Sequence, residues 1–290
     1  MSDHPGKILR AKIAERRALI APGAVSALSA WMIQDLGFEA VYITGAGVTN
    51  EHFGLPDHGF IGLTDVVQQT ALIRDAVELP LIVDVDTGFG NAVNVYRTIR
   101  MLERAGANAI QLEDQDMPKK CGHFSGKEVV STAEMVGKIK AAADARHSED
   151  FLIIARTDSR AVHGFEPAME RAQAFIDAGA DITFVEAPES LEEIRQIPKR
   201  LSVPQVLNIV IGGKTPAMDQ QEIADLGFGL VLYANAALQG AMRGMALALG
   251  TLKAKGRLDE DPAIVTPFQE RQRLVRKPFF DALEKKYAAD

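Results

Sequence analysis

Cysteine is nearly absent from this chain, with one residue, Cys121, among 290. A single cysteine excludes an internal disulfide framework and is typical of proteins that work in a reducing compartment. A block of basic residues is also missing, and the formal net charge is −7. We therefore expect neither a nucleic acid nor an anionic membrane as a partner.

Long apolar runs are missing as well. No run approaches the roughly 18 residues that a membrane span requires, and the first residues, MSDHPGKILRAKIAERR, hold no apolar stretch of a secretory signal. These absences predict a cytoplasmic location. What is present is an ordinary globular balance of 47% hydrophobic and 24% charged residues.

Short apolar runs rich in valine, isoleucine and leucine recur along the chain. They occupy residues 18–24, 40–47, 79–88, 109–115, 151–158, 182–188, 204–210 and 229–236. They do not alternate strictly with polar residues, which is expected of strands buried on both faces of a parallel sheet. Stretches with helical spacing lie between them, several ending in a glycine such as Gly106 or Gly179. Strands that alternate with helices predict an α/β fold, and we expect a (β/α)8 TIM barrel, with a doubly wound open sheet as the alternative.

The end of the chain follows a different pattern. After about residue 255, polar loops lead to an apolar-periodic helix with no strand after it. Its large apolar residues need a partner surface; they are Phe268, Val275, Phe279, Phe280 and Leu283. We therefore predict one barrel domain over residues 1–290 with a helical extension from about residue 256, and an oligomer in which a neighbouring subunit covers the extension.

Polar residues follow most of the predicted strands, where a β/α barrel has its active site. In chain order they are Thr44, Gly45, Ala46, Gly47, Asp84, Asp86, Glu113, Asp114, Arg156, Asp158, Glu186, Asn208 and Asn235. One polar residue at a strand end is as often a helix cap as a functional group. Because the residues follow strand after strand along one rim, a functional site is the better interpretation.

Three acids are expected to meet at this rim. Asp84 and Asp86 are two residues apart, a spacing that places both on one face of a strand, and Glu113 ends the next strand. Clustered carboxylates need a neutralising cation, and oxygen ligands suit Mg²⁺, with Mn²⁺ as a second choice. Solvated caps on an acidic protein are the alternative. Arg156 is a candidate clamp for a substrate carboxylate.

Cys121 lies between Lys119, Lys120 and His123, just past the fourth strand. Positive surroundings lower the pKa of a thiol, so this cysteine is a candidate nucleophile or general acid. An inert buried cysteine is the alternative, although lysines, glycine and histidine make a poor apolar neighbourhood. A zinc site is disfavoured because no second pair of ligands stands at a suitable spacing.

Several segments together resemble the isocitrate lyase/phosphoenolpyruvate mutase superfamily. They are ITGAGVTNEHFGLPD, VDVDTGFGN, QLEDQDMPKKCGH, ARTDSRAVHG, AGADITFVEAP and NIVIGGKTP. The resemblance extends from about residue 10 to about residue 255, and KKCGH is typical of its lyase branch. It implies a (β/α)8 barrel with a Mg²⁺ site and a gating loop that carries the cysteine. It also implies that the last helix is exchanged between subunits of a dimer or tetramer, and we expect a tetramer of helix-swapped dimers.

The resemblance also implies roles for individual residues. Asp84 would be the principal metal ligand, with Asp86 and Glu113 holding metal-bound waters. Cys121 would protonate the enolate formed as the carbon–carbon bond breaks. The same catalytic set includes Lys120, His123, Arg156 and the loop aspartate Asp57. The implied substrate-binding residues are Thr44, Gly45, Ala46, Gly47, Asp84, Gly122, Arg156, Glu186, Asn208, Thr215 and Asn235.

Four positions bear on the substrate. Val210 and Ile211 stand where methylisocitrate lyases have threonine and glutamate, and after Tyr233 the residues Ala234 and Asn235 stand where they have proline and an apolar residue. A pocket with fewer polar partners disfavours a third carboxylate. We predict a Mg²⁺-dependent carbon–carbon lyase that cleaves a small 2-hydroxy-dicarboxylate, of the 2-alkylmalate or 2,3-dimethylmalate type, to pyruvate and a carboxylic acid. The alternatives are a 2-methylisocitrate lyase, an oxaloacetate hydrolase or decarboxylase, and a non-catalytic dicarboxylate-binding barrel.

Overall fold

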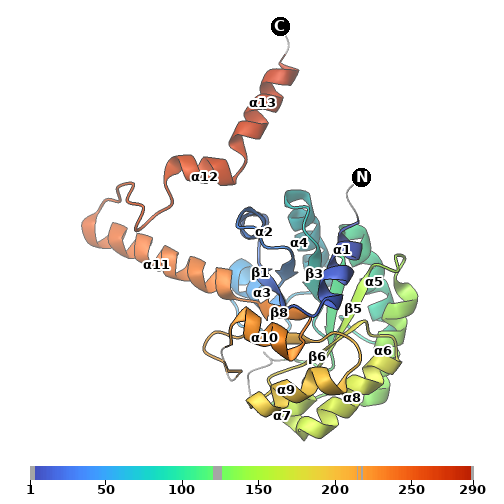
Figure 1. Cartoon of the computed structure of the whole chain (residues 1–290). Coiled ribbons are helices and arrows are strands. Elements are labelled where there is room, and N and C mark those ends of the chain that lie inside the picture. The colour runs from blue at the N-terminus through green and yellow to red at the C-terminus, as the bar shows by residue number, and fades with distance from the viewer. Residues whose placement is uncertain (1–3, 120–125, 214, 217, 289–290) are drawn as a thin grey trace. The chain divides into compact units, whose positions relative to one another are not determined.

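The computed structural model describes residues 4–119, 126–213, 215, 216 and 218–288 (Figure 1). The chain forms two compact units, Met1–Ala236 and Ala237–Asp290. Within the described residues, no helix is long and apolar enough to cross a membrane. The prediction of a single domain over residues 1–290 stays a prediction.

The first unit holds eight parallel strands with helices around them (Figure 1). The strands are β1 (Leu19–Ala24), β2 (Val41–Ile43), β3 (Leu81–Asp84), β4 (Ala109–Glu113), β5 (Leu152–Thr157), β6 (Ile182–Val185), β7 (Val206–Asn208) and β8 (Leu230–Tyr233). Neighbours pair in the order β6-β5-β4-β3-β2-β1-β8-β7, and a parallel bridge between Thr183 and Gln205 joins β6 to β7. The predicted (β/α)8 barrel is confirmed.

Ten helices begin and end in the described part of this unit. They are α1 (Pro5–Ala14), α2 (Ala27–Asp35), α3 (Gly45–Phe53), α4 (Leu63–Ala76), α5 (Ala92–Ala105), α6 (Thr132–Ala145), α7 (Ser159–His163), α8 (Phe165–Asp177), α9 (Leu191–Arg200) and α10 (Gln220–Leu226). The helix α11 (Ala236–Lys255) begins at the last residue of this unit, and α12 (Phe268–Leu274) and α13 (Lys277–Tyr287) follow in the second unit.

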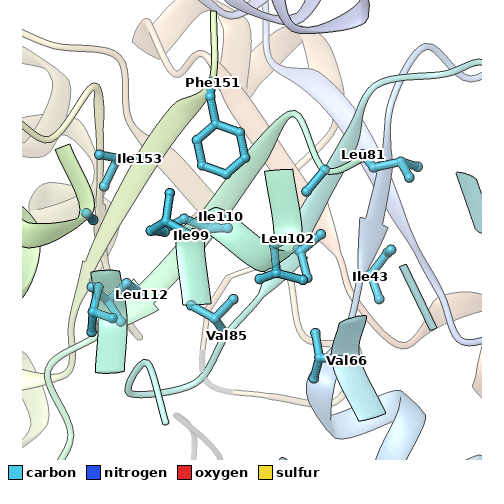
Figure 2. Close-up of a cluster of buried hydrophobic side chains, with 14 of the residues drawn as sticks. Ile43, Val66, Leu81, Val85, Ile99, Leu102, Ile110, Leu112, Phe151 and Ile153 are labelled. Carbon is cyan, nitrogen blue, oxygen red and sulfur yellow. The ribbon is translucent and has the colours of Figure 1, made fainter. Parts of the chain in front are cut away.

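Local signals explain how α5 begins and ends. Asn91 caps it, because its side-chain oxygen accepts from the backbone N–H of Val93 at 3.0 Å. The helix ends at Gly106, whose φ of 99° is a conformation that glycine adopts without strain. Its buried face includes Ile99 and Leu102. Figure 2 shows these two side chains in a cluster that packs strands against helices.

Alternation along each strand divides the core into two layers. In β5, Ile153 belongs to the outer cluster beneath the helices, whereas Leu152 and Ile154 belong to a second cluster with other inward-facing strand residues. Leu9 and Ile13 of α1 join this inner cluster and are fully buried. Because side chains alternate between the faces of a strand, the residues after each inner row are directed to the barrel interior.

The structure differs from the sequence prediction at residues 45–53. The run over residues 40–47 was expected to be a strand, but β2 ends at Ile43 and α3 begins at Gly45. Thr44 caps α3, with its Oγ1 accepting from the backbone N–H of Gly47 at 3.2 Å. A Cβ on Gly47 would lie 2.6 Å from side-chain atoms of Thr44 and Val25, so close packing requires glycine there.

Candidate active site

The candidate site lies where the inner rows of six strands end. Two-residue steps lead from Tyr42 to Thr44, Ile82 to Asp84, Gln111 to Glu113, Ile154 to Arg156, Phe184 to Glu186 and Val206 to Asn208. The inner row of each strand therefore continues into a polar group on the same face. Alternation does not account for Asp86, because β3 ends at Asp84 and Asp86 has a left-handed φ of 46°. The two carboxylates nevertheless meet beside Gly45, where a Cβ would lie 3.2 Å from Asp84 Oδ2 and 3.4 Å from Asp86 Oδ1.

A cavity of about 70 Å³ lies among these residues. Its lining residues are Tyr42, Thr44, Ala46, Asp57, Asp84, Gln111, Glu113, Lys119, Arg156, Phe184, Glu186, Asn208, Val210, Leu232, Ala234 and Asn235. One water needs about 10–15 Å³ of such space. The cavity therefore suits a small acid with a few waters, and it is too small for a nucleotide.

The acids of the site are buried. Asp84 accepts from the backbone N–H of Gly45 at 3.3 Å and from that of Asp86 at 3.1 Å. The helix N-terminus at Gly45 thus contacts a carboxylate of the protein itself. Burial raises the pKa of Asp86 to about 6, although nearby Lys119 acts in the opposite direction. Burial also raises the pKa of Glu113 well above its usual value, and Arg156 offsets part of that effect.

Lys119 enters the acidic cluster, a contact that the sequence analysis did not predict. Its Nζ lies 2.5 Å from Asp57 Oδ1 and 2.6 Å from Asp86 Oδ1, and its side chain is 4% exposed. Burial alone would lower the pKa of Lys119, but Asp86, Glu113 and the neighbouring acids raise it above the usual value. The ammonium thus links the predicted loop aspartate to the acidic cluster. The family resemblance implied a role for Lys120 instead, and Lys119 was expected only to form part of the surroundings of the cysteine.

The guanidinium of Arg156 is fixed by the carboxylate of Asp158. Its Nε donates to Asp158 Oδ2 at 2.9 Å and its Nη2 donates to Asp158 Oδ1 at 3.1 Å. Its Nη1 lies 3.3 Å from Glu113 Oε2, and the guanidinium stands over the ring of Phe184 at 5.2 Å from the centroid. Two of its three nitrogens are therefore occupied by the protein, and Nη1 is the nitrogen on the side of the acidic cluster.

Tyr42 and Gln111 form a polar pair at the cavity that sequence reasoning missed. The tyrosine hydroxyl donates to Gln111 Oε1 at 2.6 Å, and both residues are buried. Burial, with Asp84 nearby, raises the pKa of Tyr42 well above its usual value. The signal was present in the sequence, since Tyr42 stands two residues before Thr44 and Gln111 two residues before Glu113. Both were read only as members of apolar runs.

Part of the cavity lining is apolar. Phe184, Val210, Leu232 and Ala234 belong to it, as was expected for Val210. Ile211 does not take part, because its side chain is 55% exposed and it is not among the lining residues. The expectation that Ile211 helps to form the pocket wall is therefore wrong, because the chain has already turned toward solvent one residue after Val210.

Only some of the remaining predicted residues line the cavity. Asn208 Nδ2 lies 3.5 Å from Glu186 Oε1, and both residues line the cavity together with Asn235. Thr215 is buried but does not line the cavity. The predicted catalytic segment of Lys120, Cys121, Gly122 and His123 lies outside the described residues, so the roles given to these four residues stay predictions.

The described residues contain no group of three or more histidine, cysteine, aspartate or glutamate side chains arranged to hold a metal ion. The chemistry of the donors nevertheless suits a divalent cation. Asp57, Asp84, Asp86, Glu113, Asp158 and Glu186 give six carboxylates against the three cations Lys119, Lys127 and Arg156, an excess of three negative charges if all are ionised. Glu113 Oε1 is buried without a hydrogen-bond partner among the described residues. Few protein ligands and several waters, the arrangement that Mg²⁺ prefers, would fit such a site.

Buried acids and an arginine at the carboxyl ends of the strands of a barrel are the arrangement of a β/α-barrel enzyme. Comparison with known families identifies the particular family. The chain belongs to the phosphoenolpyruvate phosphomutase family, whose model, described as "Phosphoenolpyruvate phosphomutase", matches residues 9–253. The predicted superfamily resemblance is confirmed.

Two curated relatives show how similar the chain is to proteins of named activity. It is 47% identical over 237 residues to a 2,3-dimethylmalate lyase of Eubacterium barkeri. The aligned region covers 82% of this chain and 82% of that protein. It is 44% identical over 254 residues to a 2-methylisocitrate lyase of Aeropyrum pernix, covering 88% of this chain and 82% of that protein. Both names agree with the predicted carbon–carbon lyase.

Solved structures extend the comparison. A crystal structure of 2,3-dimethylmalate lyase has a TM-score of 0.93 at 34% identity and covers 100% of this chain and 97% of that chain. Oxaloacetate acetylhydrolase with 3,3-difluorooxalacetate has a TM-score of 0.89 at 33% identity, covering 97% and 95%. Phosphonopyruvate hydrolase in complex with oxalate and Mg²⁺ has a TM-score of 0.88 at 31% identity, covering 98% and 99%.

Proposed function

We propose that this protein is a Mg²⁺-dependent carbon–carbon lyase that cleaves a 2-alkylmalate of the 2,3-dimethylmalate type to pyruvate and a carboxylic acid. The observation that carries the proposal is the mixed lining of the cavity. Charged side chains of Asp84, Glu113 and Arg156 line it. The apolar side chains of Phe184, Val210 and Leu232 line it as well. This arrangement suits a substrate that has charged ends and alkyl substituents.

The apolar lining residues favour methyl groups over a further carboxylate. Burying one methyl-sized group contributes about 0.8 kcal/mol. A buried carboxylate without a hydrogen-bond partner would instead lose its hydration with no compensation. A third carboxylate directed at Val210 would meet such surroundings, so the 2,3-dimethylmalate type is preferred over methylisocitrate.

The reaction is a retro-aldol cleavage. The 2-hydroxyl group releases its proton to water as the bond between C2 and C3 breaks, and the electron pair of that bond moves onto the departing carboxylate as an enolate. Protonation at carbon by the thiol of Cys121 then completes the carboxylic acid, while C2 becomes the keto carbon of pyruvate. When bound, Mg²⁺ would stabilise negative charge on the substrate oxygens.

The chain's own residues have distinct tasks in this scheme. Asp84 would hold the cation directly, and Asp86 and Glu113 would hold its waters. Arg156 would bind the carboxylate on which negative charge develops, through the Nη1 group that Asp158 leaves available. Lys119 offsets part of the negative charge of Asp57 and Asp86, which reduces the repulsion of an incoming dianion.

A panel of substrates tests the proposal. Purified protein with Mg²⁺ is offered 2,3-dimethylmalate, other 2-alkylmalates, 2-methylisocitrate and oxaloacetate, and products are identified by NMR. Release of pyruvate with propionate from 2,3-dimethylmalate supports the proposal. Faster cleavage of methylisocitrate would instead assign the alternative lyase activity. Equimolar oxalate and acetate from oxaloacetate would assign hydrolysis, and binding without turnover of any compound would indicate a non-catalytic barrel.

We also propose a homotetramer built of helix-swapped dimers. The second unit exposes large apolar side chains, which are Met242, Met245, Leu247, Leu249, Leu252, Phe268, Val275, Phe279, Phe280 and Tyr287. The helices α12 and α13 have no buried residue. An exposed apolar set of this size needs a partner surface, and a second copy of the chain supplies one. Light scattering coupled to size exclusion should give four times the chain mass of 31.4 kDa, and removal of residues 256–290 should lower it.

A further inference from the structure

Lys127 is a buried cation without an assigned role in the proposed mechanism. Its side chain is 1% exposed, and its Nζ lies 2.6 Å from Oδ1 of Asp158, which is itself fully buried. Lysine is rarely buried to this extent, because its ammonium loses hydration that only a close partner can replace. The burial of Lys127 therefore suggests that its positive charge has a function.

The backbone beside Lys127 is fixed. Gln115 and Val129 form an antiparallel bridge. On one side of it the N–H of Asp116 donates to the carbonyl of Glu128 at 2.9 Å, and on the other the N–H of Val130 donates to the carbonyl of Asp114 at 2.9 Å. The side chain of Lys127 therefore extends from a defined point toward the end of β5.

Asp158 is shared between Lys127 and Arg156. Its Oδ1 accepts from Lys127 Nζ and from Arg156 Nη2, and its Oδ2 accepts from Arg156 Nε. Its backbone N–H donates to Asp114 Oδ1 at 2.8 Å, which fixes the carboxylate from the main-chain side. The three side chains thus form a row from Lys127 through Asp158 to the nitrogen Nη1 of Arg156.

The balance of charge explains why Lys127 is needed beside Asp158 and Arg156. A guanidinium paired in a bidentate manner with one carboxylate has little net charge left for a second carboxylate. Arg156 also has Glu113 at 3.3 Å and Glu186 at 3.9 Å, which reduce its attraction for anions further. Lys127 returns the row of Lys127, Asp158 and Arg156 to a net charge of +1, from two cations and one anion.

We propose that Lys127 is a positioning residue for Arg156. It holds Asp158 in the orientation that fixes the guanidinium, and it offsets the charge of Asp158 so that Arg156 can attract a substrate carboxylate. This inference rests on the proposed function, because it assigns to Arg156 the binding of a substrate carboxylate.

The test compares Lys127→Met with wild type, using oxalate in the presence of Mg²⁺ as the probe. Calorimetry should show oxalate binding weakened about tenfold, which corresponds to about 1.4 kcal/mol. The KM for 2,3-dimethylmalate should rise by a similar factor, with kcat reduced less than about threefold. Lys127→Arg, which keeps the charge, should restore most of the affinity.

A matched control is Arg160→Met. Arg160 makes a bidentate ion pair with Glu193, at 3.0 and 2.7 Å, and among the described residues it has no hydrogen bond or ion pair with Lys127, Asp158 or Arg156. Its loss should lower Tm but leave the affinity for oxalate unchanged. Should Lys127→Met fail to fold, Lys127→Gln replaces it, because the amide can still donate to Asp158 while the charge is gone.

Two outcomes would overturn the inference at different levels. Unchanged oxalate affinity in the Lys127 variants, beside a wild type that binds oxalate, would reject the role of Lys127 and leave the proposed function intact. A wild type that neither binds oxalate nor cleaves a 2-alkylmalate would reject the proposed function, and this inference with it.

Discussion

Lys119 lies against Asp86 at the candidate metal site, with its Nζ 2.6 Å from Oδ1 of the carboxylate. The same ammonium contacts Asp57 at 2.5 Å. A lysine of the protein thus supplies positive charge within the acidic cluster where a divalent cation is expected. This arrangement means that the lysine and the cation act on the same set of carboxylates.

Replacing Lys119 with methionine should therefore tighten Mg²⁺ binding. Removal of the ammonium leaves Asp57 and Asp86 without a counter-charge, and we expect the Kd for Mg²⁺ to fall about tenfold. Turnover should fall, because the cluster would then repel a dicarboxylate. Calorimetric titration with Mg²⁺ alone measures the first effect, with Arg160→Met as the control. Equal or weaker Mg²⁺ binding by the Lys119→Met variant would contradict this account.

The Asp86→Asn variant should change how stability depends on pH. Burial raises the pKa of Asp86 from 3.8 to about 6 in the folded protein. The folded state therefore binds a proton that the unfolded state has released, and this group's contribution to stability is lost as pH rises from about 4 to 6. The asparagine variant cannot ionise, so its stability relative to wild type should increase across that window by about 1–3 kcal/mol and then stay level.

Urea denaturation in EDTA, from pH 4 to pH 8, measures this difference. The chelator is essential, because Mg²⁺ bound to the folded state would stabilise the ionised carboxylate. A stability difference between the two proteins that is the same at pH 4.5 and pH 7.5 would show that Asp86 titrates normally.

Val210→Thr should broaden the substrate range. A hydroxyl at position 210 in the cavity lining offers a hydrogen bond to a third carboxylate, so kcat/KM for 2-methylisocitrate should rise about tenfold relative to 2,3-dimethylmalate. The matched control is Ile211→Thr at the next position, where the side chain is 55% exposed. That control should change either value less than about twofold. If both variants shift the ratio equally, Val210 is not a specificity residue.

Cys121→Ser should abolish proton delivery without preventing substrate binding. A serine hydroxyl is a far weaker acid than a thiol, so kcat should fall at least about a hundredfold. Binding of oxalate with Mg²⁺ should stay within about threefold of wild type. Full turnover by the serine variant would exclude the thiol as the acid.

Much of the fold was predictable because one physical rule governs it. A strand buried on both faces is a short apolar run, and eight such runs separated by helical spacing predict a parallel α/β fold, for which the barrel was preferred over an open sheet. The same alternation carried the prediction to Asp84, Glu113 and Arg156. The rule failed at residues 45–53, where Gly45 and Gly47 were read as the end of a strand. Glycines usually weaken a helix. In α3, however, neighbouring side chains pack closely against Gly45 and Gly47, which leaves little room for a larger residue at either position.

The candidate site was less predictable where it depends on contacts between distant segments. Lys119 and Asp57 are 62 residues apart, and no spacing rule indicates that one would reach the other. Lys127 and Asp158 are likewise joined only by the fold. Ile211 was misplaced because a turn after Val210 changes direction within one residue. A sequence pattern indicates which face a residue shares with its neighbours in the same strand, and it does not indicate the partner that a long side chain finds.

The most direct measurement is the release of pyruvate from 2,3-dimethylmalate, followed by coupled oxidation of NADH with lactate dehydrogenase. The account predicts that wild type releases pyruvate with Mg²⁺, stops when EDTA is added, and recovers when Mg²⁺ is returned in excess. Asp84→Asn should release pyruvate at least about a hundredfold more slowly. Undiminished pyruvate release in EDTA, or by the Asp84→Asn variant, would contradict a cation held by Asp84 at the ends of the barrel strands.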